Sequence, residues 1–271
     1  MSVDVEDYFQ VLAFSRQVDP RDWDSFACRV ERNVGGILEL FDQFDTKATF
    51  FTLGWVAERY PQVIRRIVAG GHELASHGFA HVRVHAQSVE QFRIDVRKTK
   101  CLLEDVGGTA VKGYRAASFS IGAKTLWAFD VLSEEGYAYS SSVYPVRHDI
   151  YGMPEAPRFA FRPVAKGALL EIPITTCAVL GRNLPCGGGG YFRLAPYALS
   201  RWAMRRVNDR DRQPCMFYFH PWEIDPDQPR IANSSLKSRF RHYVNLGMMR
   251  PRLERVLTDF KWNRIDRIFL Q

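Results

Sequence analysis

The order of short apolar runs along the chain constrains its fold more than any other feature. Runs typical of β-strands recur, with helix-like stretches between most of them, at 2–5, 47–53, 72–76, 111–115 and 137–143. Such an alternation is typical of α/β folds, in which each helix returns the chain to start a further strand beside the last one. The order therefore predicts parallel strands with helices packed on them.

Two of the expected helices have clear boundaries. Ser88 is a natural N-cap for a helix over 89–106, and Gln91 completes a capping box with it. A shorter helix over 61–69 carries Pro61 in its first turn. A Gly-Gly pair follows each helix, which is a common way for a helix to end.

The C-terminal part has a different pattern. From about residue 168 the sequence is expected to be more strand-rich, with strands over 169–175 and 215–220 and a four-glycine loop over 187–190 between them. No linker, repeat or low-complexity segment separates this part from the rest. We therefore expect a single domain over 1–271, with a distinct C-terminal part from about residue 160.

The composition restricts the class of protein. The chain has 271 residues, 46% of them hydrophobic, which is enough for a large core. Its net charge of +7 favours an anionic partner, but the basic residues form no stripe with interleaved aromatic residues, so nucleic-acid binding is the least supported function. No apolar stretch approaches the roughly 18 residues of a membrane span. The five cysteines are odd in number and contain no CxxC pair, and this pattern favours a soluble protein of the reducing cytoplasm.

The sharpest local motif is a pair of histidines four residues apart. His77 and His81 follow an expected strand, and one helical turn or a tight loop would bring both imidazoles to one side. Neutral imidazole is a good zinc ligand. Alone, the pair is also compatible with ordinary core or surface histidines.

An acidic cluster at the first strand strengthens the metal hypothesis. Asp4, Glu6 and Asp7 lie at an apolar strand, where burying several carboxylates without a cation is costly. Two histidines and one carboxylate would leave a coordination position open for water or substrate, as in catalytic sites. Alternation along a strand puts Asp4 and Glu6 on the same face, so Glu6 is favoured narrowly over Asp7 as the ligand.

Two further residues stand at the ends of expected strands. His220 ends the run Phe217-Tyr218-Phe219, at the place where barrel enzymes carry reactive groups, and could act as a general acid or be a core histidine. Arg115 ends another strand, where it could pair with a carboxylate and keep it ionised, or lie on the surface.

Together these motifs resemble the carbohydrate esterase family of polysaccharide deacetylases. The resemblance rests on Asp4 with Glu6 or Asp7, on the His77/His81 pair, on Gly113-Tyr114-Arg115 and on Phe219-His220-Pro221, in that order. It implies a distorted (β/α) barrel with fewer than eight strands. It also implies a divalent metal, with zinc as the expected ion, Asp4 as the base, His220 as the acid, and Arg115 holding Asp4.

Three longer segments resemble one subfamily more closely. They are Asp4-Val5-Glu6-Asp7-Tyr8-Phe9, Gly188-Gly189-Gly190-Tyr191-Phe192-Arg193 and His220-Pro221-Trp222-Glu223-Ile224-Asp225. They are similar to deacetylases of exopolysaccharide loci that accompany the exosortase (PEP-CTERM) sorting system. This similarity implies metal-dependent removal of N-acetyl groups from the amino sugars of a bacterial exopolysaccharide or its precursor, a hydrolysis of a non-peptide C–N bond.

The chain departs from the family pattern at Ala117, where proline is usual, and at Ser140, where an acid is common. Tyr191 and Trp222 are candidates to stack on sugar rings, and each is also compatible with a core aromatic residue. Two alternatives stay open: a metal hydrolase of a small cyclic amide, which an enclosed pocket would favour, and a catalytically silent glycan-binding protein. The polymer, the metal in the cell and the oligomeric state are not determined by the sequence.

Overall fold

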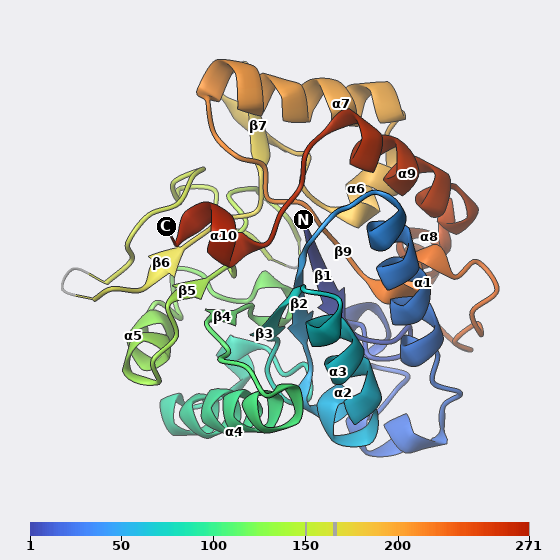
Figure 1. Cartoon of the computed structure of the whole chain (residues 1–271), viewed down its shortest axis with the longest axis vertical. Coiled ribbons are helices and arrows are strands. Elements are labelled where there is room, and N and C mark those ends of the chain that lie inside the picture. The colour runs from blue at the N-terminus through green and yellow to red at the C-terminus, as the bar shows by residue number, and fades with distance from the viewer. Residues whose placement is uncertain (150, 165–166, 271) are drawn as a thin grey trace.

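A parallel sheet forms the centre of the molecule. The computed structural model describes residues 1–149, 151–164 and 167–270. The seven-stranded sheet has the order β6-β5-β4-β3-β2-β1-β9, and every neighbouring pair is parallel. Its strands are β1 (Ser2–Val5), β2 (Thr49–Thr52), β3 (Glu73–Ser76), β4 (Gly113–Tyr114), β5 (Tyr139–Ser140), β6 (Leu170–Glu171) and β9 (Tyr218–Phe219). The sheet curls into a half-barrel with helices around it (Figure 1), which confirms the predicted barrel of fewer than eight strands.

Helices alternate with the first strands, as the sequence predicts. They are α1 (Val30–Gln43), α2 (Gly54–Arg59), α3 (Pro61–Ala69), α4 (Val89–Gly107) and α5 (Trp127–Glu134). In α4 the Gln91 amide donates to the Ser88 hydroxyl, the Gln91 side chain accepts from the Ser88 amide, and Gly108 ends the helix in the left-handed region. The predictions for α3 and α4 are confirmed to within one residue.

The strands are shorter than the sequence suggests, because the chain leaves the sheet early at its carboxyl end. Strand β5, for example, ends at Ser140 although the predicted strand continues to Val143. The amides of Ser142 and Val143 donate to the carboxylate of Glu171 instead of pairing with a strand. The backbone beyond these strands is therefore free to form the loops of the site.

The expectation of a strand-rich C-terminal part is wrong. Besides β6 and β9 this part contains one hairpin, β7 (Thr176–Val179) with β8 (Arg182–Pro185). Most of its regular structure is helical: α6 (Gly189–Leu194), α7 (Tyr197–Arg206), η5 (Val207–Asp211), α8 (Leu236–Tyr243), α9 (Met249–Asp259) and α10 (Ile265–Phe269). Helix α7 begins after Pro196 without a side-chain cap, so the capping signals used for α4 could not reveal it.

The four-glycine segment brings α6 against β9. A Cβ on Gly187 would collide with the Met216 carbonyl, and one on Gly189 would collide with the Glu223 carboxylate. Only the first half of the segment is a loop, because Gly189 and Gly190 already belong to α6. The glycines therefore allow a close approach of this segment to its neighbours.

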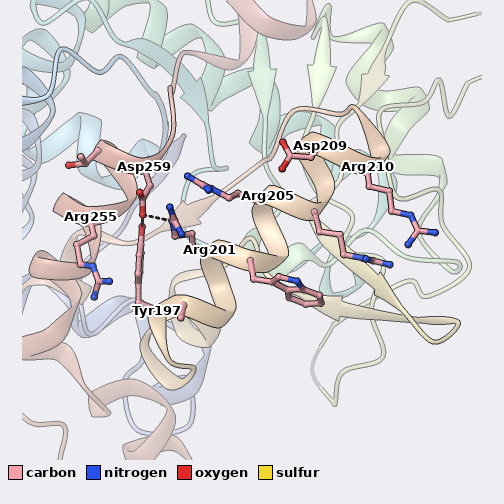
Figure 2. Close-up of a pocket in the computed structure, with 11 residues that line it drawn as sticks. Tyr197, Arg201, Arg205, Asp209, Arg210, Arg255 and Asp259 are labelled. Atoms are coloured by element: carbon pink, nitrogen blue, oxygen red, sulfur yellow. Dashed lines mark hydrogen bonds and ion pairs between the residues drawn. The ribbon is translucent and has the colours of Figure 1, made fainter.

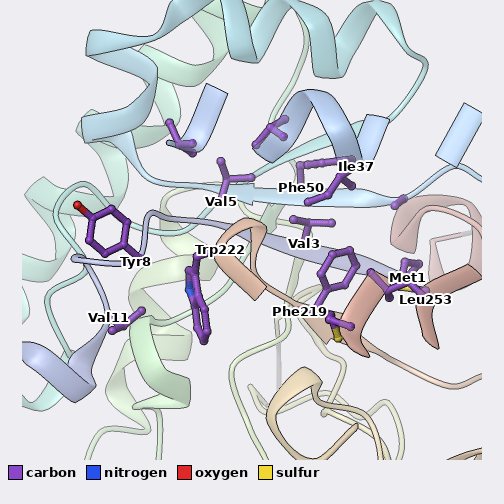
Figure 3. Packing of buried hydrophobic residues seen from close by; sticks show 14 of the residues in the cluster. Met1, Val3, Val5, Tyr8, Val11, Ile37, Phe50, Phe219, Trp222 and Leu253 are labelled. Carbon is purple, nitrogen blue, oxygen red and sulfur yellow. The ribbon is translucent and has the colours of Figure 1, made fainter. Parts of the chain in front are cut away.

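The main core lies between β1 and the outer helices. Val3 and Val5 pack with Ile37 of α1, Phe50 of β2 and Leu253 of α9 (Figure 3). Because successive side chains of a strand point to opposite faces, Ser2 and Asp4 point into the half-barrel. The apolar packing therefore fixes the strand that carries the first acid of the site.

Within the described residues no helix is both long and apolar enough to cross a bilayer. All five cysteines are free thiols, in agreement with the absence of a predicted disulfide framework.

Candidate metal centre and active site

Glu6, His77 and His81 meet at the carboxyl end of the sheet. One ligand atom from each lies within 4.8 Å of the other two. Glu6 follows β1, and His77 follows β3 with its amide bonded to the Thr52 carbonyl. The turn after His77 has a positive φ at Gly78 and at His81, which returns the second imidazole to the first. Spacing, strand and turn together produce this cluster.

The donor atoms of the cluster fit a divalent metal. Glu6 Oε2 is buried and accepts no hydrogen bond in the described structure, although His81 Nε2 is only 3.0 Å away. A buried carboxylate oxygen close to an imidazole nitrogen, without a well-aligned hydrogen-bond donor, is what a shared cation would satisfy. Two imidazoles and one carboxylate suit zinc, and they leave one tetrahedral position open.

The protonation states also suit metal binding. Burial is the main cause that lowers the pKa of His77 to about 4, so its imidazole is neutral at pH 7. Its Nδ1 lies 2.8 Å from the Arg115 carbonyl, so the ring proton is on Nδ1, and the lone pair of Nε2 is left to bind a metal. Burial opposes the charge of Glu6, but the neighbouring imidazoles, His81 first, lower its pKa to about 2.

Asp7 does not join this cluster. Its Oδ1 accepts from the Tyr8 amide, and its Oδ2 accepts from the amides of Arg29 and Val30 and from the Cys28 thiol. These amides belong to the start of α1, where helix donors lack intrahelical partners. Of the two acids that the sequence left open, Glu6 faces the histidines, and Asp7 caps a helix.

Asp4 is held by a fully buried arginine. Arg115 Nη1 lies 2.5 Å from Asp4 Oδ1 and also donates to the Ser2 hydroxyl, while Nε and Nη2 donate to the carbonyl and the hydroxyl of Ser141. Its flat face lies 4.0 Å from the Phe51 ring centroid. This environment fixes the Asp4 carboxylate at the cavity that also holds the metal-type cluster.

The two departures from the family pattern lie beside this arginine. Ser140 donates to the Ser142 hydroxyl, and the neighbouring strand supplies a buried acid, Glu171, next to it. Ala117 is buried at the start of a short turn, η4 (Ala117–Phe119), in which Ser118 has a φ of 52°. Ser118 lines the cavity, so the turn shapes the site.

His220 follows β9, which lies on one side of β1, whereas His77 and His81 follow β3 on the other side. Its Nε2 is 3.4 Å from Glu6 Oε1, and its Nδ1 is 2.9 Å from Glu223 Oε1. Burial alone would lower the pKa of His220, but the hydrogen bond to Glu223 and the charge of Glu6 outweigh it and raise the pKa to about 9. The imidazole is therefore a cation that can give up a proton.

Two residues that the sequence reasoning did not assign hold His220 in place. Glu223 is fully buried, and its Oε2 lies 2.7 Å from Arg193 Nε. Arg193 also donates to the carbonyls of Arg241, His242 and Val244. Both residues stand in the segments that carry the subfamily resemblance, and Glu223 is three residues after His220, so their positions were available in the sequence.

The two candidates for sugar stacking are largely covered by the protein. The Trp222 ring stacks on His220, with ring centroids 5.1 Å apart, and on His242, at 3.9 Å, and only 5% of the residue is exposed. Tyr191 is half-buried on α6 and does not line the cavity of the cluster. Tyr151 and Phe119 are the aromatic residues that line it beside Trp222 and Tyr218.

The site lies in a small cavity that adjoins a larger hollow. The cavity, of about 170 Å³, is lined by Asp4, Glu6, His77, His81 and His220 among others. A neighbouring hollow of about 570 Å³ shares Leu12, Ala13 and Arg241 with it. The reacting groups therefore stand at one end of a longer depression.

Comparison with known families agrees with this geometry. Residues 23–139 match the polysaccharide deacetylase family model. This part of the chain is therefore similar to polysaccharide deacetylases. The match contains His77, His81 and Arg115. Residues 141–270, which contain His220, match a domain of unknown function (DUF3473).

Individual relatives are similar over part of their length. A peptidoglycan-N-acetylglucosamine deacetylase of Bacillus cereus is 34% identical over 79 residues, 29% of this chain and 29% of that protein. A peptidoglycan deacetylase of Helicobacter pylori is 28% identical over 113 residues, 42% of this chain and 38% of that protein. The chain spans less than half the length of these two curated relatives.

A solved structure shares the whole fold. The crystal structure of a candidate polysaccharide deacetylase from Mycobacterium smegmatis covers 99% of this chain and 87% of its own, with a TM-score of 0.63 and 21% sequence identity. This likeness extends the deacetylase fold over the C-terminal part.

Proposed function

We propose that this protein is a polysaccharide deacetylase, a metal-dependent hydrolase that removes acetyl groups from the N-acetylated amino sugars of a glycan. The observation that carries the proposal is that Glu6, His77 and His81 share one cavity with Asp4 and His220. A metal-type cluster, a base candidate and an acid candidate form a complete set for amide hydrolysis. The silent glycan-binding alternative does not account for this set.

The residues of the chain divide the chemistry among them. Glu6, His77 and His81 would hold the metal, for which the donor set favours Zn²⁺. When bound, the metal supplies polarisation of the acetamide carbonyl and acidification of water. Asp4, held in a fixed position by Arg115, takes the proton of the attacking water.

His220 completes the reaction on the other side. Its cationic imidazole donates a proton to the departing amine, so that acetate and a free amino sugar leave. Glu223 orients the ring and stabilises its positive charge, and Arg193 fixes Glu223. The base is therefore held by Arg115 from the N-terminal part of the chain, and the acid is held by Glu223 from the C-terminal part.

The shape of the site supports a long substrate. Because the cavity continues into the larger hollow through Leu12, Ala13 and Arg241, a glycan could extend beyond the reacting sugar. A small cyclic amide would need no such extension. The subfamily resemblance favours an exopolysaccharide or its precursor as the polymer, and a cytoplasmic location stays a proposal from the cysteine pattern.

We also propose that the two matched regions form one domain over 1–271. Strand β9, from the C-terminal region, pairs with β1 and carries His220 to Glu6. Apolar residues from both regions share the main core. Neither region contains all the reacting groups.

The test measures acetate release from N-acetylglucosamine oligomers by zinc-loaded protein, chelated protein and the variants His77→Ala and Asp4→Asn. The expected result is release that needs metal, with bound metal lost in His77→Ala and retained in Asp4→Asn, and activity lost in both. Bound metal without release from any oligomer would favour the small-amide hydrolase. Neither metal nor release would favour the silent binding protein.

A further inference from the structure

A pocket rich in arginine lies away from the metal-type cluster. It has a volume of about 860 Å³ and is formed by α7, η5 and the end of α9. Its charged residues, which we call the arginine pocket, are Arg201, Arg205, Arg206, Arg210, Arg255, Asp209 and Asp259 (Figure 2). Five guanidinium groups thus face two carboxylates.

Most of this positive charge is not neutralised within the protein. Arg201 Nε lies 2.9 Å from Asp259 Oδ2, and the Tyr197 hydroxyl donates to the same oxygen. In the described part of the chain, the other four arginines form no ion pair with a carboxylate. An excess of unpaired arginine in one hollow attracts phosphate or carboxylate groups.

Two of the arginines are held in place by aromatic rings. The Arg255 guanidinium lies 4.0 Å from the Tyr197 ring centroid, and that of Arg206 lies 5.8 Å from the Trp202 ring centroid. Stacking limits the motion of these long side chains while their N–H groups stay available. Less conformational entropy is then lost when an anion binds.

Exposed apolar side chains gather in the same part of the sequence as the pocket. Five of the thirteen large apolar residues that are exposed in the described structure fall in one segment of the sequence: Leu180, Leu184, Leu194, Leu199 and Trp202. Leu180, at the tip of the β7–β8 hairpin, is 97% exposed, and this hairpin packs on α7. Leu199, Trp202 and Arg206 recur at helical spacing and share one face of α7.

This surface lies towards the amino ends of the strands, whereas the reacting groups lie at the carboxyl ends. Cys215, which precedes β9, contacts the Met204 carbonyl of α7. Asn263, which follows α9, accepts a hydrogen bond from the amino group of Met1 at the start of β1. A partner bound at the arginine pocket would therefore leave the catalytic cavity accessible.

We infer that the arginine pocket, with the exposed Leu199 and Trp202 of α7 beside it, docks the protein on an anionic lipid bilayer. Arginines would pair with lipid phosphates, and the exposed apolar side chains would enter the boundary between headgroups and acyl chains. An acidic glycan would use the arginines but would gain little from exposed leucines. The combination of both kinds of side chain favours the bilayer.

The test is co-sedimentation of the full chain with vesicles. One set contains phosphatidylcholine and phosphatidylglycerol, and the other contains phosphatidylcholine alone. The protein should sediment with the anionic vesicles at low salt and dissociate from them at high salt. It should not sediment with the neutral vesicles. Arg205→Gln with Arg210→Gln should weaken the partition by about 25-fold, since one arginine near an anionic surface contributes about fivefold.

Two further variants make the test specific. Leu199→Ser with Trp202→Ser should weaken binding to anionic vesicles without changing the net charge. Arg65→Gln with Lys124→Gln removes two exposed cations elsewhere and should leave binding almost unchanged. Far-ultraviolet circular dichroism establishes that each variant is folded.

Other outcomes overturn the inference. Binding to a soluble acidic polysaccharide but not to anionic vesicles would assign the pocket to a glycan. Equal losses in the pocket variant and in the Arg65/Lys124 control would mean that only net charge attracts the protein. No binding by the parent protein to anionic vesicles at low salt would also refute it.

Discussion

His220 and Glu223 form a hydrogen-bonded pair 2.9 Å apart, three residues from each other in sequence and on the same short turn after β9. The Glu223 carboxylate is fully buried and makes its second contact with Arg193. A buried carboxylate at this place keeps the imidazole protonated and fixes its direction. The pair therefore links the C-terminal part of the chain to the proposed proton donation.

Replacement of this carboxylate should impair the acid step. Glu223→Gln removes the charge that stabilises the His220 cation, so the pKa of His220 should fall and kcat for acetate release should drop about 10- to 100-fold. Because the acid must be protonated, the alkaline limb of the pH–rate profile should move to lower pH. Thermal unfolding of the variant and the parent protein, measured in parallel, separates a loss of stability from a loss of the acid step. An alkaline limb at its parental position would show that Glu223 is only structural.

Gly189 offers a more local test of the same pair. A Cβ at this position would collide with Glu223 Oε1 and lie 2.6 Å from Oε2, and the carboxylate cannot retreat because Arg193 holds it. Gly189→Ala should therefore displace Glu223 and lower kcat at least about 10-fold. Gly190→Ala is the matched control, since its Cβ would meet nothing within 4 Å. Similar kcat values for the two variants would contradict the proposed role of the close approach.

The two acids that follow β1 should separate in a metal-binding measurement. Glu6→Gln should lose tightly bound zinc, whereas Asp7→Asn should retain it, because Asp7 is engaged with the start of α1. Asp7→Asn should instead lower the free energy of unfolding by about 1 to 2 kcal/mol, since buried helix donors lose a charged acceptor. Zinc content by elemental analysis and urea unfolding of the chelated proteins measure the two effects. If Asp7→Asn lost zinc and Glu6→Gln retained it, Asp7 would be the metal ligand and Glu6 would not.

The sequence was sufficient to predict the first half of the molecule because its signals are local. Ser88 and Gln91 cap α4 within one turn, and the His77/His81 spacing needs only a tight turn to form a pair. The choice between Glu6 and Asp7 was narrow because it depends on where the chain turns after Val5. That turn follows from the contact of Asp7 with α1, which no local pattern reveals.

The second half depends on contacts between distant segments. Arg193 and Glu223 meet only because glycines let α6 approach β9. The sequence left Trp222 open as a residue that stacks on a sugar or as a core aromatic residue, and in the structure its ring stacks on His242 of α8. No spacing in the sequence indicates that two such distant rings stack on each other. A tryptophan at this position is equally compatible with a binding site and with a core.

The acid stability of the fold should depend on His72. Its Nδ1 accepts a hydrogen bond from the Ala48 amide at 3.1 Å, and burial, with Lys47 nearby, lowers its pKa from 6.5 to about 4. The unfolded chain therefore binds a proton between pH 6.5 and 4 that the folded protein does not. Stability from this residue is complete above pH 6.5 and is lost as the pH falls, at most about 1.4 kcal/mol per pH unit.

The variant His72→Asn should reduce this pH dependence, because the asparagine side chain can accept the Ala48 hydrogen bond but does not titrate. We expect the free energy of unfolding, from urea titrations of chelated protein at pH 7 and pH 5, to fall less in the variant than in the parent. The difference should be on the order of 1 to 2 kcal/mol. His85→Asn is the control, since that ring is exposed and near the surface arginine Arg83. An equal fall in the parent and in His72→Asn would place the acid sensitivity in other groups.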